Sequence, residues 1–144
     1  MTVPYFLDTN VLVYATSLAR DHASKRDVAR SWVARIDWGL STQVLMELFA
    51  QARQSRHGLL PDAAKALVER LAASRHVVSV DRELVVEALA LSQSHLLSHW
   101  DAAILCAARR LGAHTLVSED LAHGQSFNGV TVHNPFSTLH GATT

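Results

Sequence analysis

Apolar positions along the chain follow two different periods. Residues 5–7 form a short apolar run, and from Asn10 onwards the apolar pattern favours a helix. Three later runs are similarly short and rich in apolar or β-branched residues, at 77–80, 114–117 and 130–133. We predict a β-strand for each of these four runs.

The intervening stretches have the period of amphipathic helices. Residues 24–38 carry apolar side chains four and five positions apart and end before Gly39, which predicts a helix with a glycine stop. Four further predicted helices begin at residues that favour helix N-termini: Ser41-Thr42, Pro61-Asp62, Asp81 and Ser98. Strands that alternate with helices predict an α/β fold with a central parallel sheet flanked by α-helices.

The length and composition are those of one globular domain. A chain of 144 residues with 49% hydrophobic and 18% charged residues can bury a single core. We therefore expect one domain over residues 1–144, with a core over about 1–135 and a loose C-terminal tail over 136–144.

The formal net charge is +0, from 13 basic and 13 acidic residues, so no overall basic field announces a nucleic-acid partner. A protein that grips phosphate through divalent cations or local arginines can still be neutral. Cys106 is the only cysteine and can form no internal disulfide, which favours a reducing compartment. Without a run of about 18 apolar residues or a basic leader, a cytoplasmic protein with no membrane contact is expected.

Two aspartates follow predicted strands. Asp8 ends the run at 5–7, and Asp120 lies just beyond the run at 114–117. In a parallel sheet the carboxyl ends of the strands share one edge, where ligands bind. Helix capping or a turn is the alternative interpretation of each residue alone.

Two more acids belong to predicted helices. Asp101 shares a helical face with Ile104 and Leu105, so we expect a buried carboxylate that must pair, protonate or bind a cation. Ser98 and Asp101 also fit a capping box, which would explain the carboxylate structurally. Glu47 lies at the edge of an apolar helical stripe, where an ordinary surface residue is the alternative.

If the four acids converge, they require cations. Two carboxylates at 4 Å repel by about 4 kcal/mol at an effective dielectric constant of 20. Hard oxygen ligands select Mg²⁺ or Mn²⁺, and such ions support hydrolysis of phosphodiesters. The acids therefore indicate a metal-dependent phosphodiesterase.

Four segments, 6–10, 41–48, 100–104 and 118–124, give the chain a family resemblance. It resembles the PIN-domain ribonucleases, and specifically the VapC-type toxins of type II (VapBC) toxin–antitoxin pairs. The resemblance implies a PIN-like fold in which four acids form the catalytic metal site: Asp8, Glu47, Asp101 and Asp120. It also implies that Asn10 and Ser118 support these acids, and Glu119 is a further candidate for contact with a metal-bound water.

The same resemblance implies the activity and the partners. We expect an endoribonuclease that uses Mg²⁺, with Mn²⁺ as a possible substitute, and leaves a 5′-phosphate and a 3′-hydroxyl. A homodimer and a VapB-type antitoxin, whose C-terminal segment covers the acidic pocket, are also implied. Apolar residues within 59–71 could contact such a partner or belong to the core.

Two other functions remain open at the level of sequence. A haloacid-dehalogenase-like phosphatase also begins with an acid after its first strand, but Asn10 stands where that family has a second aspartate. A PIN-like scaffold that binds partners without cutting is the other alternative. His95 and His99 lie four apart but lack the glutamate of zinc proteases, and neither a Gly-x-Ser-x-Gly elbow nor a phosphate-binding loop occurs.

Overall fold

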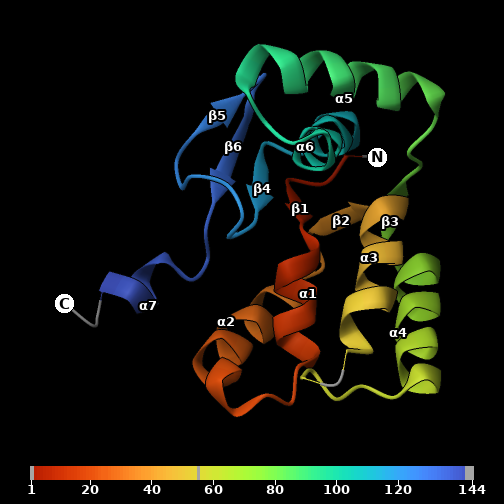
Figure 1. The fold of residues 1–144 in the computed structure, drawn as a ribbon, viewed down its shortest axis with the longest axis vertical. Coiled ribbons are helices and arrows are strands. Elements are labelled where there is room, and N and C mark those ends of the chain that lie inside the picture. Colours follow the sequence, from red (N-terminus) through yellow and green to blue (C-terminus); the bar gives the residue numbers. More distant parts are fainter. Residues whose placement is uncertain (1, 55, 142–144) are drawn as a thin grey trace.

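The computed structural model describes residues 2–54 and 56–141. In these residues six strands form one sheet, in the order β3-β2-β1-β4-β6-β5 (Figure 1). The strands are β1 (Tyr5–Leu7), β2 (Trp38–Ser41), β3 (His76–Val78), β4 (Thr115–Val117), β5 (Ser126–Phe127) and β6 (Val130–His133). Neighbouring strands pair in parallel, except that β5 is antiparallel to β6. The predicted α/β class with a largely parallel sheet is confirmed.

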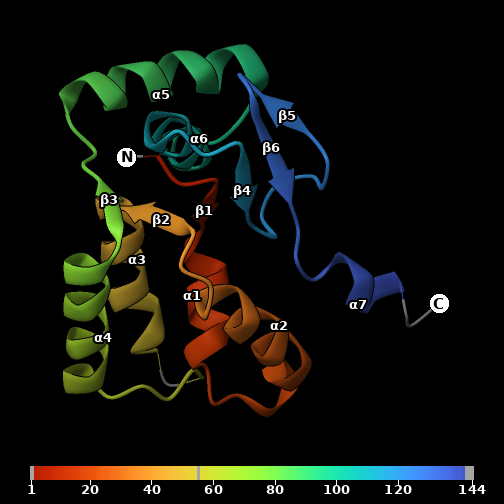
Figure 2. The ribbon, with the colours of Figure 1, turned by 180° about the vertical axis from the view of Figure 1, so that it is seen from behind.

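Helices lie on both sides of this sheet. They are α1 (Thr9–Thr16), α2 (Ala23–Val33), α3 (Thr42–Ala52), α4 (Pro61–Ser74), α5 (Arg82–His95), α6 (His99–Leu111) and α7 (Ser137–Gly141), with a short 3₁₀ helix at Arg20–His22. In Figures 1 and 2, α5 and α6 lie above the sheet and α1 to α4 below it. None of the described helices is long and apolar enough to cross a membrane.

The core is centred on α6, which packs against five of the strands, all but β5, and is covered by α5. Eight residues of α6 are buried, from Ala102 to Ala108 and at Leu111. Its alanines let the helix approach the sheet closely, and Gly112 ends it in a left-handed conformation with φ +85°. This arrangement brings the N-terminus of α6, with Asp101, to the carboxyl ends of the strands.

The structure corrects the predicted helix over 24–38. Helix α2 ends at Val33, and Trp38 to Ser41 form the buried strand β2. Gly39 does not stop a helix. It lies within the strand, where an added Cβ would meet the His76 carbonyl oxygen at 2.7 Å. The short run hides its strand character because a glycine interrupts the apolar pattern.

Three smaller differences concern the ends of elements. Strand β3 ends at Val78 rather than at residue 80, and the hairpin strand β5 was not predicted. Phe136 is fully buried and is followed by α7, so the chain is packed where the loose tail was expected to begin. Residues 142–144 of that expected tail lie outside the described residues.

Candidate active site

The four predicted acids line one cavity of about 340 Å³ at the carboxyl edge of the sheet. Asp8 follows β1, and Asp120 follows β4. Glu47 lies on α3, which begins where β2 ends, and Asp101 lies in the first turn of α6. The fold thus brings together, from four separate segments, the acids that the sequence singled out.

Asp8 is both a helix cap and a buried acid. Its Oδ1 accepts a hydrogen bond from the backbone N–H of Thr9 at 2.7 Å, and Ser118 Oγ donates to its Oδ2 at 2.7 Å. The residue is only 5% exposed. Burial raises the pKa of Asp8 to about 7, against the two hydrogen bonds that favour the charged form. The capping interpretation of Asp8 is therefore confirmed, and the same side chain lines the cavity.

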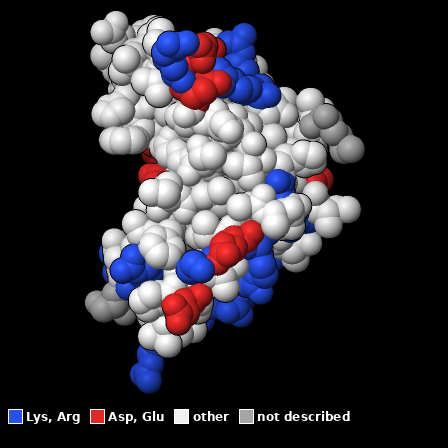
Figure 3. Space-filling model, turned by 90° about the vertical axis from the view of Figure 1, so that its right-hand side faces the viewer, with Lys and Arg blue, Asp and Glu red and all other residues white. Residues whose placement is uncertain are grey.

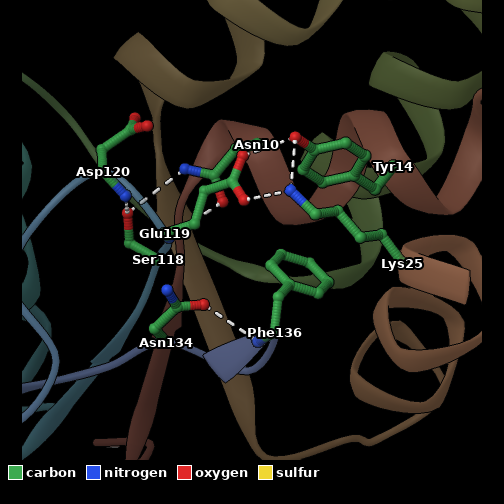
Figure 4. A network of polar contacts seen from close by, with 8 residues as sticks. All are labelled: Asn10, Tyr14, Lys25, Ser118, Glu119, Asp120, Asn134 and Phe136. Atoms are coloured by element: carbon green, nitrogen blue, oxygen red, sulfur yellow. Dashed lines mark hydrogen bonds and ion pairs between the residues drawn. The ribbon is translucent and has the colours of Figure 1, made fainter. Parts of the chain in front are cut away.

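Ser118 links the two strand-end aspartates, and Figure 4 shows its contacts with Asn10 and Asp120. Ser118 Oγ donates to Asp8, and it accepts from Asn10 Nδ2 at 3.2 Å and from the backbone N–H of Asp120 at 3.1 Å. The hydroxyl group therefore uses its single hydrogen and both acceptor positions. These contacts agree with the supporting role expected for Asn10 and Ser118.

Glu47 is half-buried and is held by two residues that sequence reasoning missed. Thr9 Oγ1 donates to Glu47 Oε1 at 3.1 Å, and Gln43 Nε2 donates to the same oxygen at 3.5 Å. Burial is the main cause that raises the pKa of Glu47. The sequence signal was present for Gln43, which lies four residues before Glu47 on one helical face.

Asp101 and Asp120 complete the acidic wall of the cavity. Ser98 Oγ accepts from the backbone N–H of Asp101 at 3.1 Å, so the predicted cap is confirmed. Asp101 is half-buried, like Glu47, rather than fully buried as predicted, because α6 enters the core only from Ala102 onwards. Burial raises the pKa of Asp120, and the negative charge of Asp101 contributes to the same shift.

Glu119 also lines the cavity, but unlike the other four acids it is paired with a lysine. Its carboxylate forms an ion pair with Lys25 Nζ at 2.8 Å and accepts a hydrogen bond from the Tyr14 hydroxyl. Figure 4 shows the Glu119 carboxylate turned toward Tyr14 and Lys25, whereas the Asp120 carboxylate lies apart from these contacts. The predicted contact of Glu119 with a metal-bound water gains no support from this geometry, because the carboxylate is already paired.

The four acids of the cavity lack such a partner. Within residues 2–54 and 56–141, no lysine or arginine forms an ion pair with Asp8, Glu47, Asp101 or Asp120. In the same residues no three acidic, histidine or cysteine side chains are close enough to hold one ion as they stand. A cation would have to draw the carboxylates together across the cavity.

Other lining residues carried no sequence signal. Tyr14, His22, Arg56 and His57 reach the cavity from α1, from the 3₁₀ helix and from the turn between α3 and α4. Such turns have no periodicity from which a shared site could be read. His95 and His99, four apart in sequence, belong to two different helices.

Comparison with known proteins agrees with this architecture. Residues 5–124 match the model of the PIN domain family. No curated protein sequence is similar enough to be matched to the chain.

Several solved structures share the fold. A toxin–antitoxin complex from Klebsiella pneumoniae is 20% identical, with a TM-score of 0.65 over 91% of this chain and 97% of the other. The sarcin-ricin loop cleaving toxin VapC20 from Mycobacterium tuberculosis is 21% identical, with a TM-score of 0.62 over 81% and 91%. DNA-bound VapBC from Salmonella typhimurium is 18% identical, with a TM-score of 0.66 over 93% and 99%.

The family match covers most of the chain, including the strand end with Asp8, the helices with Glu47 and Asp101, and the strand end with Asp120. The structural neighbours share the same fold at low sequence identity. The chain therefore belongs to the PIN-domain family.

Proposed function

We propose that the protein is a divalent-cation-dependent endoribonuclease that acts as the toxin of a toxin–antitoxin pair. The observation that carries this proposal is the convergence of four acids, from four segments of a PIN domain, on one cavity. A structural neighbour that is named for cleavage of the sarcin-ricin loop supports RNA as the substrate.

The donor set of the cavity fits a hard divalent cation. Carboxylate oxygens are the ligands that Mg²⁺ and Mn²⁺ prefer, and Asp8, Glu47, Asp101 and Asp120 would hold the ion. When bound, it would supply positive charge to the attacked phosphate and the leaving oxygen, and lower the pKa of a water molecule.

The protein's own residues prepare this site. Ser118 and the Thr9 backbone hold the Asp8 carboxylate, and Thr9 and Gln43 hold Glu47. Glu119 also lines the cavity, but Lys25 already pairs with its carboxylate. The remaining carboxylates have no protein cation to satisfy them among the described residues, which leaves their charge available to a bound ion.

The alternatives predict other behaviour. A haloacid-dehalogenase-like phosphatase would release phosphate from small phosphomonoesters, and a PIN-like scaffold would bind partners without turnover. Both remain outcomes of the same assay.

The test is cleavage of total RNA by purified protein, with Mg²⁺ or Mn²⁺ and with EDTA. Wild type is expected to cut only with the metal ion and to leave 5′-phosphate and 3′-hydroxyl ends. Asp8→Asn should lose at least about 100-fold in rate, because it removes a ligand from the site. Asp27→Asn, an exposed acid on α2 outside the cavity, is the matched control.

Products with 2′,3′-cyclic phosphates would contradict the proposed mechanism. No cleavage by folded, antitoxin-free protein under either metal ion would redirect the search to the phosphatase or the scaffold.

We also propose a homodimer and an antitoxin whose segment covers the acidic cavity. Structural neighbours include toxin–antitoxin complexes, which supports the antitoxin.

Action on cellular RNA fits a cytoplasmic location. The apolar residues of α4 divide: Ala64 and Leu71 are buried, whereas Leu60 just before the helix is exposed and open to a partner.

An apolar groove beside the active site supports the dimer. It is lined by α3, α5 and α6, and it shares Gln43, Glu47 and Trp100 with the acidic cavity. Met46 is 73%, Trp100 61% and Leu89 51% exposed. Large side chains of this kind are typical of interface cores. The side of the molecule in Figure 3 is mostly uncharged across its middle, between charged groups at the top and bottom.

A further inference from the structure

A second group of polar side chains lines the cavity of the four acids. His22, Arg56 and His57 belong to this wall, and the hydroxyl of Ser17 lies beneath them. Ser17 is fully buried and His57 is 3% exposed. Within the described residues none of the four forms a hydrogen bond to Asp8, Glu47, Asp101 or Asp120. They are held instead by hydrogen bonds to one another.

The hydrogen bonds of this group run in one direction. Arg56 Nε can only donate, and its partner at 3.2 Å is His57 Nε2, which must therefore accept. The ring proton of His57 is then on Nδ1, which donates to Ser17 Oγ at 3.0 Å. The single hydroxyl proton of Ser17 remains for His22 Nδ1, at 3.0 Å.

Ser17 leaves no freedom to reverse this order. Its Oγ also accepts from the backbone N–H of Ala19 at 3.2 Å, so its two acceptor positions and its hydrogen are all used. Burial, together with the charge of Arg56, lowers the pKa of His57 and keeps its ring neutral. His22 therefore carries its N–H at Nε2, the nitrogen that faces no Ser17 contact.

The ring of His22 is also held by two neighbouring rings. It stacks on His57 with centroids 5.4 Å apart and meets the edge of Tyr14 at 4.9 Å. A ring with a fixed orientation and a fixed tautomer presents a directed hydrogen-bond donor.

Arg56 brings the positive charge. Only its Nε is used by His57, and within the described residues no acid forms an ion pair with it. The guanidinium NH₂ groups are thus left to a ligand, and a planar guanidinium suits the oxygens of a phosphate. One side of the cavity therefore carries acids that can bind a cation, and another side carries Arg56 and His22, which can bind an anion.

We propose that Arg56 and His22 bind a phosphate of the RNA backbone adjacent to the phosphate that lies at the four acids. Ser17 and His57 are positioning residues for this subsite. The inference rests on the proposed function, because it requires a polynucleotide that extends along the cavity. It assigns these side chains to strand binding and leaves the cleavage step to the acids.

The first test measures binding of a fluorescein-labelled single-stranded RNA of mixed sequence by anisotropy in EDTA. Arg56→Met and His22→Asn should each weaken binding by about tenfold, as for a lost charge-assisted hydrogen bond. Arg56→Met should also reduce the slope of log affinity against log salt by about 0.7. Arg53→Met is the matched control, because Arg53 packs over the Phe49 ring outside the cavity.

Cleavage assays separate binding from chemistry. In Mg²⁺ the Arg56→Met variant should raise KM by about tenfold with little change in kcat, as for an interaction made equally before and during reaction. Wild type that cleaves RNA while Arg56→Met matches Arg53→Met in both assays would overturn the subsite alone. Wild type that neither binds nor cleaves RNA would overturn the proposed function and the subsite with it.

The second test examines the positioning residues without RNA. Imidazole ¹⁵N chemical shifts should show His57 protonated at Nδ1 and His22 at Nε2. Ser17→Ala should release His22 into a mixture of tautomers while circular dichroism confirms the fold. A wild-type spectrum with His57 protonated at Nε2 would overturn the proposed order, and that spectrum needs no variant to fold.

Discussion

Asp8 is a buried carboxylate, and no lysine or arginine of residues 2–54 and 56–141 forms an ion pair with it. Two hydrogen bonds, from Ser118 and from the Thr9 backbone, favour its charged form, yet burial outweighs them and its pKa rises to about 7. Without a bound cation, the ionised Asp8 carboxylate therefore destabilises the folded state. A residue kept at such a cost is typical of a functional site.

The pKa of Asp8 has a consequence for stability. Because the folded-state pKa lies above the ordinary value of 3.8, the native state holds this proton more tightly than the unfolded chain. The contribution of Asp8 to the free energy of unfolding is fully present below about pH 4 and is lost as the pH rises through about 7. Above that pH this contribution no longer changes. In EDTA, the contribution of Asp8 to the free energy of unfolding should fall by about 3 kcal/mol between about pH 5 and 8.

Urea unfolding of wild type and Asp8→Asn at both pH values checks this. The variant lacks the Asp8 carboxyl, so its free energy of unfolding should fall by about 3 kcal/mol less than that of wild type, and Glu47 and Asp120 account for dependence that remains. Addition of Mg²⁺ at about pH 8 should recover part of the stability of wild type, because the ion binds only the folded site. Equal pH dependence in the two proteins would show that Asp8 is not the group responsible.

At the scale of elements, β2 decides where Glu47 lies. The strand is buried between β1 and β3, and its last residue, Ser41, caps α3 by accepting a hydrogen bond from the Val44 backbone N–H at 3.3 Å. Helix α3 then carries Glu47 to the cavity one turn later. The register of β2 therefore fixes the position of one site acid.

Gly39 is the most constrained position of this strand. A Cβ there would meet the His76 carbonyl oxygen at 2.7 Å and Leu111 Cδ2 at 2.9 Å. We predict that Gly39→Ala destabilises the protein by about 1–3 kcal/mol, as for an overpacked core. Chemical denaturation measures the loss as a lower midpoint with an unchanged slope. An unaltered midpoint would mean that the strands tolerate a wider separation than the structure shows.

At the scale of the whole molecule, the apolar groove between α3, α5 and α6 is exposed in a single copy of the chain. Leu89 is half-exposed within it, so a charged residue there can reach water in a monomer but not in an apolar interface. We predict that Leu89→Glu converts a dimer to a monomer, with a dimer Kd raised at least about 100-fold.

Sedimentation equilibrium with circular dichroism tests this prediction. Ile36→Glu is the matched control, because Ile36 is exposed but lies outside the groove. A monomeric wild type, or a Leu89→Glu protein that remains dimeric, would show that a second copy does not cover this groove.

Patterns among residues close together in the chain predicted most of the helices and strands and the position of two of the acids. The period of the apolar positions predicted four of the six described strands and most helices, since amphipathic periodicity is a property of neighbours in the chain. Acids placed directly after strands, Asp8 and Asp120, pointed to the carboxyl edge of the sheet because parallel strands share that edge. The caps Ser98 and Asp81 were readable for the same local reason.

Only the tertiary structure decided the rest, where the determining contacts lie far apart in sequence. Trp38 to Ser41 become a strand because β1 and β3 flank them, and Glu119 is paired because Lys25 reaches it from α2. The order of hydrogen bonds from Arg56 to His22 likewise depends on segments about 35 residues apart, joined by a buried serine. A pattern of polar and apolar residues records which face is buried, but it does not record which partner a charged group will meet.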